Sequence, residues 1–180
     1  STLECSICYE VFQDPYSSLN PMWSIDRIIR EPLDVFGIGT RADRSRKVAA
    51  VLDQVAMPVS MRDRRPVDLS GGQRQRIAIA RALISEPELL ICDEAVSALD
   101  VLVQEQILDL LRQLQTELGV SCLFITHDLA VVANLADDVV VMKSGEVVET
   151  GLTQDVVDHP QADYTKSLLA AVPGSGLLNA

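Results

Sequence analysis

The stretch "DLSGGQRQRIAIARAL", residues 68–83, sets two adjacent glycines directly before a run with the spacing of an amphipathic helix. Ser70 stands where the cap of that helix belongs. The first turn of a helix leaves N–H groups unpaired and carries partial positive charge, and glycine lets a ligand approach the backbone closely. The pattern predicts an anion-binding helix end at Ser70, Gly71 and Gly72. An ordinary capped helix is the alternative, because Ser-Gly is common at helix starts.

Downstream of this stretch, helices alternate with short, wholly apolar strands. Strands that are apolar on both faces and separated by helices predict an α/β fold, with a parallel sheet and helices on both faces. An apolar stripe in the helix expected over 101–118 predicts that this helix crosses over the sheet in the right-handed sense. The stripe consists of Ile107, Leu111, Leu114 and Leu118. A hairpin around "KSGE" and a last helix in "DYTKSLLAAV" follow. The expected elements are a helix over 73–84, a strand over 89–92, a helix over 101–118, a strand over 121–126 and a helix over 128–135.

Two acidic residues follow the apolar strand in "LLICDEAVSALD", residues 89–100. In doubly wound sheets the ligand crevice lies beyond the carboxyl ends of the strands. We therefore predict that Asp93 holds Mg²⁺ through its water shell and that Glu94 orients or polarises an attacking water. The alternative is an acidic pair that caps the next helix.

A histidine follows the next strand, in "SCLFITHDL", residues 121–129. Because a single crossover joins this strand to the previous one, the two are expected to be neighbours, with His127 at the same edge as Glu94. A lone histidine usually lies on the surface or in the core. One beside a carboxylate pair at a strand end is a candidate for contacting a phosphate.

The charge of the chain is unevenly distributed. The formal net charge is −11, of which residues 1–81 contribute +2 and residues 82–180 contribute −13. Nucleic-acid binding depends on Lys and Arg neutralising phosphates, so this balance argues against a nucleic-acid partner. The arginines of "RADRSRK" and "RDRR" belong either to a docking surface or to solvated helix faces.

Neither apolar runs nor cysteines indicate a membrane-spanning or secreted protein. Hydrophobic residues make up 48% of the chain, but no apolar run approaches the roughly 20 residues of a spanning helix. Cys5 and Cys8 form a lone CxxC, for which we predict no bound metal. Cys92 and Cys122 lie in apolar strands and are predicted to be core residues in a reducing compartment. No secretion signal is recognisable, which favours the cytoplasm.

Five motifs together resemble those of an ATP-binding cassette (ABC) ATPase. "LSGGQ" (69–73), "LLICDE" (89–94), "SALD" (97–100) and "ITHD" (125–128) are similar to its signature, Walker B, D-loop and H-loop. The glutamine of "VFQDPYSSLNP" (11–21) is similar to its Q-loop. The motifs occur in the order of the family and cover nearly the whole chain. "DPYSSLNP" and the tail "HPQADYTKSLLAAVPG" further resemble the oligopeptide, dipeptide and nickel importer ATPases.

The resemblance implies a role for each site residue. Glu94 would be the general base, Asp93 would serve Mg²⁺, and His127 would contact the γ-phosphate of ATP. Gln13 would reach the magnesium and the nucleophilic water. In the signature, Ser70, Gly71, Gly72 and Gln73 would touch ATP held by a second ABC ATPase subunit, and Asp100 would couple the two sites across the dimer.

The resemblance also implies a domain organisation. Residues 1–180 would be part of an ABC ATPase domain with a partial P-loop NTPase (RecA-like) core made of residues 1–13 and 68–150. Residues 14–67 would be an inserted α-helical subdomain that docks on transmembrane permease subunits. Residues 151–180 would be a C-terminal helical tail of the peptide-importer type.

The chain also departs from the family pattern. No G-x-x-x-x-G-K-[ST] occurs in it, so the Walker A loop that cradles phosphates is missing, and Ala95 stands where the family usually has proline. We interpret the chain as part of an importer ATPase that lies on the inner face of the cell membrane. The resemblance implies that the importer takes up dipeptides, oligopeptides or a related solute, which a solute-binding protein delivers. The chain alone is expected to be inactive. The alternative is an interaction fragment that docks on transporter subunits without hydrolysing ATP.

Overall fold

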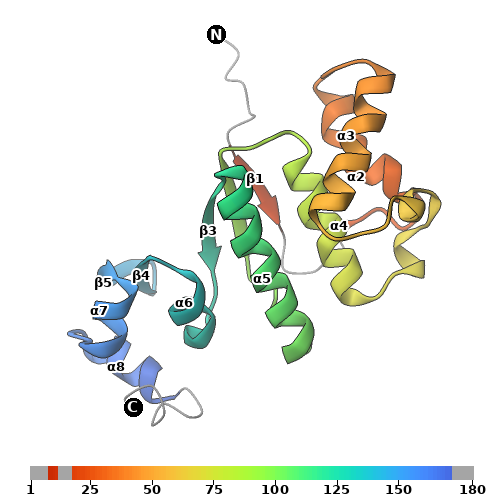
Figure 1. Ribbon diagram of the computed structural model, residues 1–180. Helices are drawn as coiled ribbons and strands as arrows, with labels where there is room; N and C mark the ends of the chain where they lie inside the picture. Colours follow the sequence, from red (N-terminus) through yellow and green to blue (C-terminus); the bar gives the residue numbers. More distant parts are fainter. Residues whose placement is uncertain (1–7, 12–17, 172–180) are drawn as a thin grey trace. The chain divides into compact units, whose positions relative to one another are not determined.

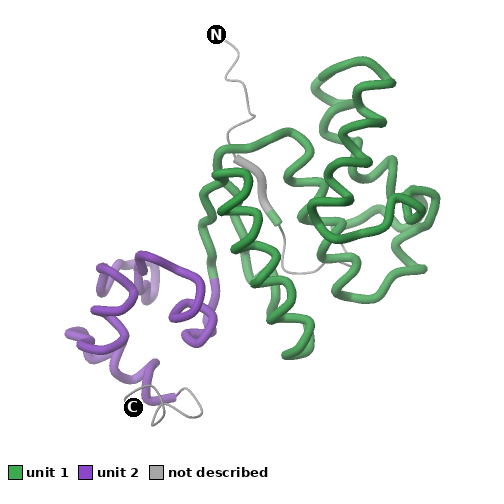
Figure 2. The backbone as a smooth tube through the Cα atoms, viewed as in Figure 1, with its two compact units in different colours: residues 1–125 green, residues 126–180 purple. Residues whose placement is uncertain are grey.

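The structure, a computed structural model, describes residues 8–11 and 18–171. Gln13 and Cys5 lie outside the described residues. The chain divides into two compact units, residues 1–125 and residues 126–180 (Figure 2). This division does not test the predicted subdomain boundaries, which stay predictions.

The first unit contains a three-stranded parallel sheet in the order β1–β2–β3 (Figure 1). Ile91 of the central strand pairs with Glu10 on one side and with Leu123 on the other. Helix α5 returns the chain from the end of β2 to the start of β3, so the predicted α/β class and parallel crossover are confirmed. The bounds are β1 Cys8–Val11, β2 Leu89–Asp93, α5 Val101–Leu118 and β3 Ser121–Ile125.

Helix α5 ends as the sequence predicts. Gly119 adopts a left-handed conformation with φ 67°, and its N–H donates to the carbonyl of Gln115, an arrangement that stops an α-helix. The predicted stripe is buried at its first three positions and exposed at its last, Leu118, which is 44% exposed. The buried positions are Ile107, Leu111 and Leu114.

The two faces of β3 differ in cover. Leu123 and Ile125 on one face are 50% and 47% exposed, whereas Cys122 and Phe124 on the other face are half-buried. The sequence predicts cover on both faces because the strand is apolar throughout. Among the residues described in the first unit, no segment buries the face of Leu123 and Ile125.

The helical part of the first unit forms one group beside the sheet (Figure 1). Ser24 caps α2, its hydroxyl accepting from the Arg27 N–H at 3.4 Å, and Thr40 caps α3 in a reciprocal capping box with Asp43. The apolar face of α3 is buried, with Val48, Val51, Leu52 and the C-cap residue Val55 all in the core. The bounds are α2 Ile25–Val35, α3 Arg41–Gln54, η1 Val59–Asp63, η2 Pro66–Asp68 and α4 Gly71–Leu83.

Several arginines of this region pair with its own acids. Arg44 donates to Asp34 at 2.6 Å, and Arg62 donates to Asp26. The hydrogen bond from Arg30 lowers the pKa of Asp34 below its usual value. These ion pairs orient the helices. They also neutralise part of the positive charge on which the docking surface considered in the sequence analysis would depend.

In its described part, residues 126–171, the second unit holds a β-hairpin and three helices. Strands β4 and β5 pair antiparallel around a tight turn in which Ser144 and Gly145 have φ of 53° and 85°, as two-residue hairpin turns require. The predicted hairpin is therefore confirmed. In the described part of the chain, no helix is both long enough and apolar enough to cross a membrane. The bounds are α6 Leu129–Leu135, β4 Asp138–Lys143, β5 Glu146–Leu152, α7 Thr153–Asp158 and α8 Asp163–Ala170.

Cys92 and Cys122 are free thiols in neighbouring strands. Cys92 is buried and Cys122 half-buried, so the core role predicted for them is confirmed for Cys92 and holds in part for Cys122. Burial disfavours the thiolate, which raises the pKa of Cys92 and raises the pKa of Cys122 to about 11. The prediction that Cys5 and Cys8 bind no metal is not tested, because neither side chain is among those described.

The raised pKa predicts slow alkylation of Cys122. Only the thiolate reacts, so the rate in the folded chain should rise through a midpoint near pH 11, above the ordinary value of 9.0. The rate is measured by mass spectrometry of the peptide that contains Cys122. In urea-unfolded chain, which serves as the control, the midpoint should return to the ordinary value. A folded-state midpoint at the ordinary value would show that β3 does not desolvate this thiol.

Candidate functional site

The first turn of α4 is built by a reciprocal capping box. The Ser70 hydroxyl accepts from the Gln73 N–H at 3.3 Å, and the Gln73 side-chain oxygen accepts from the Ser70 N–H at 3.0 Å. The helix therefore begins at Gly71, two residues before the predicted start at 73. The N–H groups of Gly71 and Gly72 have no acceptor inside the helix, because they belong to its first turn. These two N–H groups are therefore left for a ligand or for water, and the anion-binding role of this helix end stays a prediction.

The two glycines pack against the start of α5. A Cβ placed on Gly72 would lie 2.5 Å from Cγ1 of Val103, a distance that real Cβ contacts do not show. A Cβ on Gly71 would lie 3.4 Å from Cδ2 of Leu99, an ordinary contact. The sequence predicts glycine here for close approach to a ligand. The structure adds a second reason at Gly72, which is the close approach of Val103.

Asp100 is the N-cap of α5. Its side-chain oxygen accepts from the Val103 N–H at 3.0 Å, and the residue is exposed. Because Leu99 and Val103 contact the glycines of α4, the structure brings Asp100 and the Ser70–Gln73 turn together on one side of the first unit.

The predicted acidic pair lies at the carboxyl end of β2. Asp93 is the last residue of the strand, and Glu94 follows with φ 45°, in the left-handed region that costs a non-glycine residue energy. The Glu94 N–H donates to the carbonyl of Ile125 at 2.9 Å, and its carbonyl accepts from the N–H and the hydroxyl of Ser97 at 3.1 and 3.0 Å. Both side chains are half-buried. The alternative role as a helix cap is wrong, because Asp100 caps α5.

The carboxylates of Asp93 and Glu94 suit a metal ion that is also coordinated by phosphate. Among the described residues, no group of three or more His, Cys, Asp and Glu side chains lies together to hold a metal ion. Mg²⁺ in phosphoryl-transfer sites takes one or two carboxylates and completes its shell with water and phosphate oxygens. One strand-end carboxylate beside a second one fits that requirement.

His127 belongs to the second unit, where it is exposed. Its neighbour Asp128 caps α6, accepting from the Ala130 N–H at 2.9 Å, and the Asp128 N–H donates to the Thr126 hydroxyl at 3.0 Å. These bonds fix the turn that carries the histidine. The predicted contact of His127 with the acidic pair remains a prediction, as does the role of Gln13, which is outside the described residues.

Comparison with known proteins decides the family. The sequence model described as ABC transporter matches residues 8–97. The chain belongs to the ABC transporter family. The solved structure of CbiO1 from Clostridium perfringens, described as part of the ABC transporter complex CbiONQ, superposes with a TM-score of 0.77 at 28% identity and covers 97% of this chain and 68% of that one. The predicted ABC ATPase fold is thereby confirmed.

Curated relatives of this ABC family chain include two from Brucella. A putative peptide import ATP-binding protein of Brucella ovis is 47% identical over 163 residues, which cover 91% of this chain and 51% of that protein. Another from Brucella abortus is 50% identical over 163 residues, covering 91% and 49%. The chain thus spans about half the length of the curated relatives it matches.

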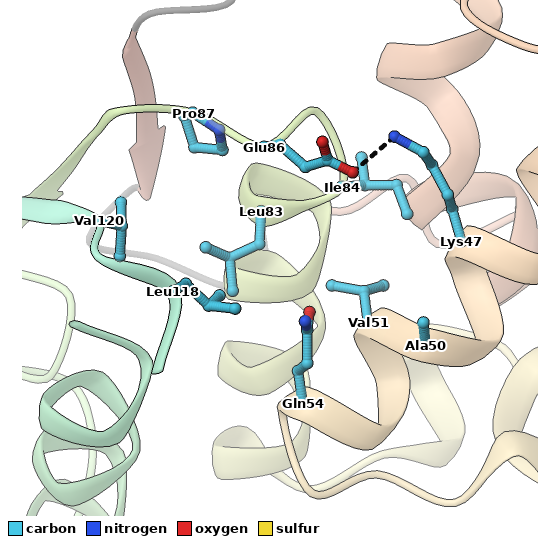
Figure 3. Close-up of a pocket in the computed structure, with 10 residues that line it drawn as sticks. All are labelled: Lys47, Ala50, Val51, Gln54, Leu83, Ile84, Glu86, Pro87, Leu118 and Val120. Atoms are coloured by element: carbon cyan, nitrogen blue, oxygen red, sulfur yellow. Dashed lines mark hydrogen bonds and ion pairs between the residues drawn. The ribbon is translucent and has the colours of Figure 1, made fainter. Parts of the chain in front are cut away.

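A cavity of about 320 Å³ lies at the other end of α4, between α3 and the end of α5 (Figure 3). Lys47 and Glu86, paired at 2.7 Å, belong to its lining, and Leu118 contributes to the apolar part. Leu118 is exposed because its side chain lines this cavity. None of the predicted site residues contributes to this cavity.

Proposed function

We propose that this chain is part of the ATP-hydrolysing subunit of an ABC importer and that the subunit couples hydrolysis to the import of peptides or a related solute. The observation that carries the proposal is the open first turn of α4, with Gly71 and Gly72 packed beside the Asp100 turn. Membership of the ABC transporter family supports the ATPase activity. The names of the Brucella relatives support peptides as the solute.

ATP fits these residues as one half of a site. A helix end with two glycines offers a few N–H donors and about half a unit of positive charge, too little to hold a triphosphate in water. The 180 residues contain no G-x-x-x-x-G-K-[ST] that would supply the rest. In the proposed arrangement, Ser70–Gln73 therefore close over the γ-phosphate of ATP that a second ATPase subunit holds, and Asp100 contacts that subunit.

In the proposed dimer, the acidic pair acts on ATP bound by the complete subunit that contains it, and not on ATP bound by the partner. In the complete subunit, Asp93 would hold Mg²⁺ through its water shell, and Glu94 would take the proton from the attacking water as general base. Bound Mg²⁺ supplies neutralisation of the phosphate charge. His127 would contact the γ-phosphate, and Gln13 would reach the magnesium and the water. The hydrogen bond from the Glu94 N–H to Ile125 fixes the backbone of Glu94. This supports the proposed role, because a general base must be held within reach of the proton that it takes.

The proposed partners follow from the same reading. The subunit pairs with a second ABC ATPase subunit, and residues 14–67 dock on transmembrane permease subunits at the inner face of the membrane. A solute-binding protein delivers the solute to those permeases. The description of CbiO1 as part of a transporter complex supports assembly with further subunits.

The test is a mixed-pair assay. The 180-residue chain is combined with a complete peptide-import ATPase subunit whose own signature serine is replaced, so that pairs of that subunit alone lack a working signature. We expect no hydrolysis of magnesium-ATP by either protein alone and clear hydrolysis by the mixture, because only the mixed pair completes a site. A mixture as inactive as its components would contradict the proposal.

A further inference from the structure

We infer that Val103 is a positioning residue, which occupies the space left by the missing Cβ of Gly72 and thereby fixes the signature turn relative to Asp100. The inference rests on the proposed function and deepens it. It assigns to Gly72 a packing role that is distinct from contact with nucleotide.

The contact between the two residues is specific. A Cβ on Gly72 would lie 2.5 Å from Cγ1 of Val103, and the other branch, Cγ2, would lie at 3.9 Å. In a helix, valine holds one strongly preferred χ1 rotamer, so the methyl group does not turn aside at low cost. The body of α5 is anchored by buried Ile107 and Leu111. An added Cβ therefore displaces the first turn of α4 or that of α5.

Both of these turns carry groups proposed to act on the partner's ATP. The first turn of α4 presents the N–H groups of Gly71 and Gly72, and Asp100 caps α5 through the N–H of Val103 at 3.0 Å. Val103 therefore makes a hydrogen bond to Asp100 through its N–H and packs against Gly72 through its methyl group. Because a misplacement of about 1 Å can cost about 100-fold in rate, this packing sets the geometry of hydrolysis in the partner.

Two explanations of why position 72 requires glycine make different predictions. If a Cβ on Gly72 is harmful because it strikes the nucleotide, shortening Val103 cannot help. If it is harmful because it strikes Val103, removing the γ-methyl groups restores the turn. The double variant Gly72→Ala with Val103→Ala separates these explanations.

The experiment uses the mixed pair described above, with wild-type chain, Gly72→Ala, Val103→Ala and the double variant. We expect Gly72→Ala to lower kcat at the partner's site about tenfold or more, with KM nearly unchanged. Val103→Ala alone should lower kcat by a smaller factor, because the turn loses its packing contact, and the double variant should recover to the level of Val103→Ala, since a Cβ on Gly72 would lie at an ordinary 3.8 Å from the Cβ of residue 103. A double variant as slow as Gly72→Ala, in a pair whose wild-type form is active, would overturn the inference and leave the proposed function intact. Inactivity of the wild-type pair would overturn both.

A second measurement separates misfolding from misplacement. Urea unfolding of the same chains should show that Gly72→Ala is destabilised by the overpacking and that Val103→Ala in the same chain removes this loss. Gly71→Ala is the matched control, because its Cβ meets Leu99 at an ordinary 3.4 Å and should not destabilise the chain. Equal destabilisation by Gly71→Ala and Gly72→Ala would contradict the packing role of Val103.

Discussion

Replacing Glu94 by Gln is expected to abolish steady-state ATP hydrolysis when this chain is expressed behind a segment that supplies a phosphate-binding loop. Glutamine has nearly the same size but cannot take a proton from water, and a positioned general base contributes about 10²–10⁴-fold to rate. ATP binding and ATP-driven association of the subunits should persist, since affinity comes chiefly from the phosphate cradle. Phosphate release measures the first effect, and size-exclusion chromatography with ATP measures the second.

The matched control is Glu105→Gln, which removes the same charge from an exposed position of α5. The fold around Glu94 should survive its substitution, because the bonds to Ile125 and Ser97 are made by backbone atoms of Glu94. Turnover equal to that of wild type in Glu94→Gln would remove this carboxylate as the base. Loss of ATP-driven association would show that Glu94 serves binding more than chemistry.

Replacing Gly71 by Glu is expected to stop hydrolysis at the partner's site in the mixed pair. The new carboxylate would lie at the helix end that we propose faces the γ-phosphate of the partner's ATP, and like charges repel. The partner's own affinity for ATP should change little, because its phosphate cradle lies on the partner. Hydrolysis is measured by phosphate release and affinity by titration of the partner with a fluorescent ATP analogue.

Unfolding does not explain this expected loss. The space at Gly71 accepts a Cβ, and a negative charge near a helix N-terminus stabilises the helix. Gly71→Gln provides the neutral comparison of equal size, and it should retain more activity than Gly71→Glu. Equal losses in the two variants would assign the effect to size, and unchanged hydrolysis in Gly71→Glu would remove the α4 end from the site.

Local sequence signals predicted the elements that have clear ends. The predicted limits of α5 agree with the structure, in which Asp100 caps one end and Gly119 stops the other, both residues of the types that favour helix ends. The cap of α4 was predicted correctly at Ser70, but the helix itself was placed two residues too late, because glycine has low helix propensity and Gly71 and Gly72 were left outside it. The acidic pair was found from its place after an apolar strand.

Contacts between distant segments could not be predicted from the sequence. The packing of Val103 into the space beside Gly72 depends on how two helices cross, and a spacing of 31 positions along the chain gives no signal of it. The exposure of Leu123 and Ile125 was also missed, because apolarity shows that a face needs cover but not which segment provides it. The left-handed backbone of Glu94 had no signal either, since glutamate is not a residue that favours it.

The most direct test of the half-site is a calorimetric titration of the isolated 180-residue chain with ATP and magnesium. The open turn at Ser70–Gly72 and the acidic pair lack a phosphate cradle, so we expect affinity in the millimolar range at best and no measurable hydrolysis. Micromolar binding by this chain alone would contradict the half-site, because the 180 residues would then hold a complete nucleotide site without a second subunit.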